Sequence, residues 1–124
     1  MAMKKWNTKK KKKKKKGGAG STKYLKRGAM KRLYVLVNNK LKPVYGCVQG
    51  GHAVAQFMME NPDQEWNNEF LIYLYADVMK WMKILKEHGL KFTVFREPDL
   101  NNSITAIACQ DDSGELFKDL SVVR

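Results

Sequence analysis

The chain has 124 residues, of which 24 are Lys or Arg and 12 are Asp or Glu, so its formal net charge is +12 at neutral pH. This length accommodates one compact domain with a modest core and leaves no spare length for a second. No apolar run approaches the length of a membrane span, and the N-terminal lysines lack the apolar segment of a secretory signal. These features predict a soluble, cytoplasmic protein.

The positive charge is concentrated near the N-terminus. Residues 1–29 contain 13 of the 24 basic residues and no acidic residue, whereas residues 30–124 contain 11 basic and 12 acidic residues, a net charge of −1. Lys9 to Lys16 is an unbroken lysine run followed by a glycine-rich stretch, and like charges at that density repel one another. We therefore expect a disordered leader over 1–29 and a nearly neutral folded domain over 30–124.

The role of this leader has three open interpretations. It could be an arm that grips nucleic-acid phosphates without sequence preference. It could be foreign to the domain, since Met30 would serve as a start, or it could have a targeting or solubilising role.

Four apolar runs rich in β-branched and aromatic residues predict strands over 33–37, 70–75, 91–96 and 103–109. A strand–helix–strand segment over 70–96 requires a parallel crossover, whereas the short loop between the last two strands favours an antiparallel pair. The expected fold class is therefore α/β, a single domain with a mixed four-stranded sheet flanked by helices.

Two helices are expected between these strands. In the first, from Gly46 onward, four small or apolar residues recur at helical spacing: Cys47, Gly51, Val54 and Met58. In the second, Asp77 is placed to cap the N-terminus and Gly89 to follow the C-terminus.

Three residue types carry further expectations. Gly50 and Gly51 each weaken a helix interior by about 1 kcal/mol relative to Ala, which favours close approach of the helix to a strand. Cys47 and Cys109 match no metal-binding spacing and are expected to be reduced, buried thiols. Trp66 lies in a polar segment, where it could stack on a nucleic-acid base.

Three segments in order resemble the peptidyl-tRNA hydrolase type II family. They are Gln-Gly-Gly-His-Ala at 49–53, Tyr-Ala-Asp at 75–77, and Phe-Arg-Glu-Pro-Asp at 95–99 followed by Ser-Ile-Thr-Ala-Ile-Ala at 103–108. The resemblance covers about residues 32–123. It implies an enzyme that needs no metal or cofactor and hydrolyses the ester between a peptide and the 3′ ribose of tRNA, with tRNA as the partner. A homodimer is left open.

The chain departs from the family pattern at the start of the first helix. Family members usually carry Lys-Gly-Lys there, and one of those lysines is implicated in hydrolysis. The aligned residues here are Pro43, Val44 and Tyr45, and the available cations lie just upstream at Lys40 and Lys42. The pattern is similar to a divergent branch of the family.

The resemblance assigns the other catalytic positions. The family's loop Asp corresponds to Glu97 or Asp99, and its pair of Thr hydroxyls to Ser103 and Thr105. Together with Lys42, these would supply a proton acceptor, hydroxyl partners and an oxyanion contact. The supporting residues would be Gln49 and His52, and the RNA contacts Lys40 and Lys42.

Each of these residues also has a structural interpretation. Lys42 could be a solvated loop lysine, Glu97 and Asp99 could stabilise their own turn, and His52 could hold the helix against the sheet. The functional alternatives are thus an ester hydrolase, a catalytically weakened relative that binds tRNA or another RNA, and a protein-interaction module on the same fold. The first two require that the turns near 42 and 97 lie at the same end of the sheet.

Overall fold

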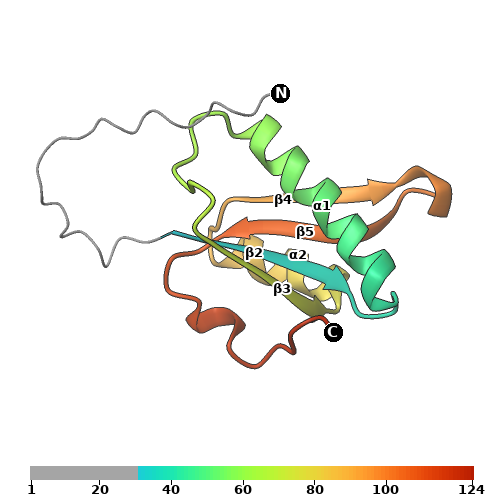
Figure 1. Ribbon diagram of the computed structural model, residues 1–124. Coiled ribbons are helices and arrows are strands. Elements are labelled where there is room, and N and C mark those ends of the chain that lie inside the picture. The colour runs from blue at the N-terminus through green and yellow to red at the C-terminus, as the bar shows by residue number, and fades with distance from the viewer. Residues whose placement is uncertain (1–30) are drawn as a thin grey trace, which may run out of the picture. The chain divides into compact units, whose positions relative to one another are not determined.

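The backbone alternates strands and helices over residues 31–124, which are the residues described by the computed structural model (Figure 1). The expected disordered leader over 1–29 lies outside the described residues. The regular elements are β2 (Arg32–Asn38), α1 (Pro43–Glu60), β3 (Phe70–Ala76), α2 (Val78–Glu87), β4 (Phe92–Glu97) and β5 (Ser103–Gln110). Two 3-10 turns, η3 (Pro98–Leu100) and η4 (Glu115–Phe117), follow the last two strands.

The four strands form one mixed sheet in the order β3-β2-β5-β4. Strand β2 pairs in parallel with β3, and β5 is antiparallel to both β2 and β4. Strands β2, β3 and β4 therefore run in one direction and β5 in the other, as their arrowheads show (Figure 1). The α/β class and the mixed four-stranded sheet agree with the prediction. Within residues 31–124, no helix is both long and apolar enough to span a membrane.

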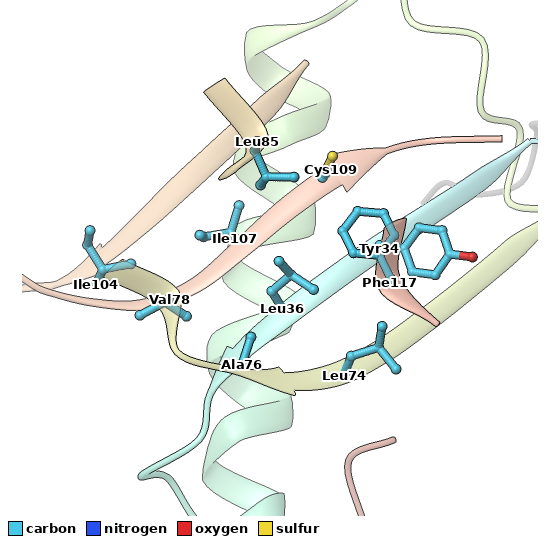
Figure 2. Packing of buried hydrophobic residues seen from close by; sticks show 10 residues of the cluster. All are labelled: Tyr34, Leu36, Leu74, Ala76, Val78, Leu85, Ile104, Ile107, Cys109 and Phe117. Atoms are coloured by element: carbon cyan, nitrogen blue, oxygen red, sulfur yellow. The ribbon is translucent and has the colours of Figure 1, made fainter. Parts of the chain in front are cut away.

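One face of the sheet is covered by α2 and η4. Figure 2 shows ten buried side chains of this core, contributed by β2, β3, β5, α2 and η4: Tyr34, Leu36, Leu74, Ala76, Val78, Leu85, Ile104, Ile107, Cys109 and Phe117. The ring of Phe117 stacks between Tyr34 and Trp81, with ring centroids 4.3 Å and 5.5 Å away. This stacking attaches the C-terminal segment to the sheet.

The opposite face is covered by α1, and here the expected helix face is wrong. The predicted stripe included Cys47 and Gly51, which are exposed, whereas the helix buries a stripe offset by one residue: Gly46, Gln49, Gly50, Ala53 and Phe57. The reason is close packing, because a side chain at Gly46 would come within 2.6 Å of Val37 Cγ1. Small residues face the sheet, and apolarity alone does not reveal them.

The ends of both helices have identifiable causes. Helix α1 starts at Pro43, earlier than the expected Gly46, because Pro fits the first helical position, where its missing N–H costs no hydrogen bond. Helix α2 follows the prediction: the Asp77 carboxylate accepts from the Lys80 N–H at 3.2 Å, and Gly89 has φ +67° just after the last turn.

The expectations for cysteine and tryptophan are only partly met. Cys109 is buried, and burial together with nearby Asp111 raises the pKa of its thiol to about 12. Cys47 is exposed on α1, so its expected burial is wrong. Trp66 does not offer the stacking surface that was considered for it, because its side chain is buried and its indole N–H donates to the Phe70 carbonyl at 2.8 Å.

Two adjacent glycines of α1 provide a matched test of this packing. A Cβ at Gly50 would collide with the Tyr73 ring and lie 2.9 Å from Val35 Cγ1, whereas a Cβ at Gly51 meets nothing within 4 Å. Gly50→Ala should therefore lower the free energy of unfolding by about 1–3 kcal/mol. Gly51→Ala should raise it by about 0.5–1 kcal/mol, because it only restricts the unfolded chain and improves helix propensity. Urea denaturation of both variants measures the difference, and equal effects would contradict the close approach.

Candidate functional site

The turns after β2 and β4 lie at the same edge of the sheet, namely the end where β2, β3 and β4 have their carboxyl ends. Both strands are antiparallel to β5, so their carboxyl ends, Asn38 and Glu97, point the same way (Figure 1). A direct bond ties the first turn to the start of β5: the Asn38 side-chain amide donates to the Ile104 carbonyl at 3.2 Å. The requirement that the turns near residues 42 and 97 lie at the same end of the sheet is thus met.

A buried amide connects three elements at this edge. The Gln49 side chain on α1 is only 2% exposed, and both ends of its amide are hydrogen-bonded. Its Oε1 accepts from the Thr105 hydroxyl at 2.6 Å, and its Nε2 donates to Glu97 Oε1 at 2.8 Å. The structure therefore brings together three of the residues that the sequence singled out.

A bulge between β4 and β5 puts the Thr105 side chain in position. The pairing of Phe95 with Ala106 is followed directly by that of Arg96 with Ile104, so Thr105 has no partner on β4. A bulge of this kind re-aims side chains. Thr105, which is 1% exposed, bonds Gln49 of α1, and its neighbour Ala106 also packs in the core beneath α1. The bulge therefore interrupts the alternation of side-chain directions along β5 and turns the Thr105 hydroxyl toward Gln49.

Glu97 is the chemically distinctive member of the cluster. It ends β4 with its side chain partly buried, and it also caps η3, because Oε2 accepts from the Asp99 N–H at 3.2 Å. The hydrogen bond from Gln49 is the main cause of a lowered pKa for the Glu97 carboxyl, followed by the Asp99 N–H and the nearby His52. The group is therefore held as a carboxylate with fixed orientation.

His52 lies one turn after Gln49 on α1 and is exposed. Its ring stacks on Phe95 of β4, with ring centroids 4.8 Å apart and planes 14° from parallel. Within residues 31–124 it makes no hydrogen bond to a backbone group, but its stacking on Phe95 connects α1 to β4, in line with the structural role considered for it. Its imidazole is accessible to solvent close to the Glu97 carboxylate.

The two turn lysines are exposed at this edge. Lys42 is the N-cap residue of α1, and its carbonyl accepts from the Gly46 N–H at 2.8 Å. The Lys40 N–H donates to Asn38 Oδ1 at 3.0 Å, which fixes the turn. Neither ammonium group forms an ion pair with any residue in 31–124. Their charges are thus presented to solvent at the same end of the sheet as Glu97, with β5 between the two turns.

The side chains of Asp99 and Ser103 do not join the cluster. Asp99 is exposed and contributes its backbone N–H to Glu97, so of the two candidate loop acids Glu97 is the one held by Gln49. The Ser103 hydroxyl donates to the Leu100 carbonyl at 2.6 Å and closes the turn after η3. Both residues therefore stabilise the turn in this structure, as the structural interpretation of the loop anticipated.

Two residues that shape the site were not singled out from the sequence. Asn38 links the lysine turn to β5, and Phe95 provides the surface on which the His52 ring rests. The Asn-Asn pair after an apolar run is typical of a side-chain-stabilised turn and could have indicated the first. The contact of Phe95 with His52 depends on which strand lies beneath α1, and no local sequence pattern shows this. No group of three or more His, Cys, Asp or Glu side chains in 31–124 is arranged to hold a metal ion.

Replacing the buried amide tests whether it controls the carboxylate. In Gln49→Leu, the Glu97 carboxyl loses its main hydrogen bond, so its pKa should rise toward the ordinary value for glutamate. A lowered folded-state pKa stabilises the fold above the unfolded-state pKa, and this contribution is lost as pH falls through the folded-state value. The variant should therefore lose less stability than wild type on acidification below about pH 4.3. Carboxyl NMR titration measures the pKa, and an unchanged Glu97 titration would contradict the role of Gln49.

Comparisons with known proteins support the fold and leave function open. No protein-family model matches the chain, and no curated protein matches it. Among solved structures, the fold is similar to that of a protein of unknown function from Agrobacterium tumefaciens, with a TM-score of 0.54 and 9% sequence identity. The similarity covers 75% of this chain and 97% of the other chain. At this level of identity the likeness shows a shared α/β fold alone.

Proposed function

We propose that the protein is an ester hydrolase that acts on peptidyl-tRNA, with its active centre around Glu97. The observation that carries this proposal is the Gln49 amide, which fixes the Glu97 carboxylate at the edge where Lys40 and Lys42 are presented. A fixed carboxylate at the same end of the sheet as two exposed lysines suits an ester substrate attached to a polyanion. The resemblance to the type II peptidyl-tRNA hydrolases supports the same reaction.

In this proposal Glu97 orients the attacking water and accepts its proton. The bond from Gln49 limits the carboxylate to one orientation and lowers its pKa, and the group is ionised at neutral pH as an ordinary glutamate is. The same shift makes the group a weak base, so positioning contributes more than basicity. The exposed His52 imidazole, one turn after Gln49 on α1, would carry the proton onward to solvent.

The start of α1 supplies the positive potential. Its first turn contains no acidic residue, and Pro43 is followed by backbone N–H groups at Val44 and Tyr45 that have no carbonyl partner within the helix. These N–H groups and the Lys42 ammonium would stabilise either the tetrahedral oxyanion or the phosphate next to the ester. Residues 1–29, with 13 basic residues, would add contacts to the tRNA backbone that are independent of sequence.

A catalytically weakened RNA-binding protein is the second candidate. The family resemblance places lysines where α1 begins, and the corresponding residues here, Pro43 and Tyr45, carry no positive charge. The nearest cations, Lys40 and Lys42, precede the helix instead of lying on it. If neither ammonium reaches the ester, the edge would bind tRNA without cleaving it.

Hydrolysis of blocked aminoacyl-tRNA distinguishes the two candidates. With diacetyl-lysyl-tRNA as substrate, the full chain should release the blocked amino acid. Glu97→Gln should lower kcat/KM by about 100-fold or more, because the proton acceptor is lost. Lys42→Ala should lower it about tenfold, as expected for one charge-assisted contact. Circular dichroism should show unchanged folding in both variants.

Matched substitutions on α2 provide the control. Lys83 and Glu87 are exposed on that helix, which packs against the other face of the sheet. Lys83→Ala and Glu87→Gln change the same charges and should leave turnover within about twofold. Salt-sensitive tRNA binding without ester release would favour the second candidate. Unchanged turnover in both Glu97→Gln and Lys42→Ala would contradict the placement of the active centre.

A further inference from the structure

A second hollow opens at the same edge of the sheet, between the carboxyl ends of β2 and β3. The chain leaves β2 for α1 on one face and leaves β3 for α2 on the other, as the two separate cores show. Adjacent parallel strands whose connections diverge in this way create a crevice at their carboxyl ends, where open α/β sheets bind ligands. A hollow of about 450 Å³ lies at the β3 side of this position, lined also by Lys80 of α2 and by residues 119–121 of the C-terminal segment, which include the carboxylate of Asp119.

The hollow combines aromatic and polar groups. Trp81 supplies aromatic surface and is held in place by stacking on Phe117. Asp77 and Asn39 line it at the ends of the two strands. The Asp77 carboxylate uses only Oδ1 to cap α2, so Oδ2 can accept another hydrogen bond. None of these groups belongs to the cluster around Glu97.

We propose that this hollow holds one unpaired cytidine from the 3′ strand of a bound tRNA. Stacking on an aromatic side chain suits a nucleobase, and a carboxylate acceptor suits a base with an exocyclic amine, such as the N4 amine of cytosine. Uracil presents a carbonyl oxygen at the same position and would face the carboxylate unfavourably. This inference rests on the proposed function, because it names the part of the tRNA that the same edge recognises.

The spacing of the strands indicates which nucleotide is held. Strands β3 and β4 are separated by three inter-strand steps of about 4.8 Å, or about 14 Å. This exceeds the reach from a nucleobase to the 3′ oxygen of its own ribose, so an ester at Glu97 excludes the terminal adenosine from the hollow. The nucleotides before it in a tRNA are cytidines, whose amine matches Asp77.

Nucleotide titration of the ¹⁵N-labelled full chain tests the hollow directly. Cytidine 5′-monophosphate should shift the Trp81 indole N–H signal, assigned by its loss in Trp81→Phe. Trp66 provides an internal reference, because its indole N–H is bonded to Phe70 inside the fold. Uridine 5′-monophosphate should bind about fivefold more weakly, as expected for one lost hydrogen bond. Inorganic phosphate alone should not shift the Trp81 signal.

Asp77→Asn is the sharpest variant because Asn caps a helix as well as Asp does. The new amide can donate, so the preference for cytidine over uridine should disappear or reverse. Asp63→Asn, an exposed acid in the loop after α1, removes the same charge and should keep the preference. A shift that is equal for both nucleotides in wild type and in Asp77→Asn, or a shift reproduced by phosphate, would overturn the proposal.

The outcome can be separated from that of the proposed function. With diacetyl-lysyl-tRNA, Asp77→Asn should raise KM and leave kcat unchanged. Ester release without selective cytidine binding overturns the cytidine site and leaves the hydrolase intact. Selective cytidine binding at Trp81 without ester release supports the site and contradicts the hydrolase.

Discussion

The candidate site depends on one buried amide. Gln49 is enclosed between α1, β4 and β5, where an unpaired polar group would cost about 1–3 kcal/mol, so both ends of its side chain need partners. Thr105 supplies the donor and Glu97 the acceptor. Because an amide has distinct donor and acceptor ends, this arrangement fixes the orientation of the side chain and, through it, of the carboxylate. The same bonds that satisfy the core therefore shape the edge of the sheet.

Close packing of α1 makes this connection possible. Gly46 and Gly50 bring the helix backbone onto Val37 and Val35 of β2, so a side chain of ordinary length at position 49 reaches β4 and β5. The bulge at Thr105 completes the contact from the strand side. The hollow beside Asp77 arises from the divergence of α1 and α2, so both candidate sites follow from how the two helices cover the sheet.

Much of the fold could be predicted from local patterns. The four apolar runs correspond to β2–β5, Asp77 and Gly89 mark the ends of α2, and the strand directions place the turns near 42 and 97 at one edge. The buried face of α1 was predicted only in part: Gly50 approaches the sheet closely, as the cost of a glycine within a helix indicated, whereas Gly51 faces open space, and the hydrophobic pattern placed the stripe one residue too far along. The separation of Glu97 from Asp99 and of Thr105 from Ser103 likewise depended on a bulge and on turn hydrogen bonds. The bulge arises from how β4 and β5 pair in the folded sheet, and the composition of the turn does not indicate which of its side chains will bond to the backbone.

The central claim is that Gln49 and Thr105 act as a coupled pair that holds the carboxylate edge together. A double-mutant cycle with Gln49→Leu and Thr105→Val, measured by urea denaturation, tests it most directly. Each single substitution leaves a buried polar partner unsatisfied, whereas the double variant removes both groups. We expect a coupling energy of about 1–2 kcal/mol between the two sites. Effects that add to within about 0.3–0.5 kcal/mol would contradict the coupling.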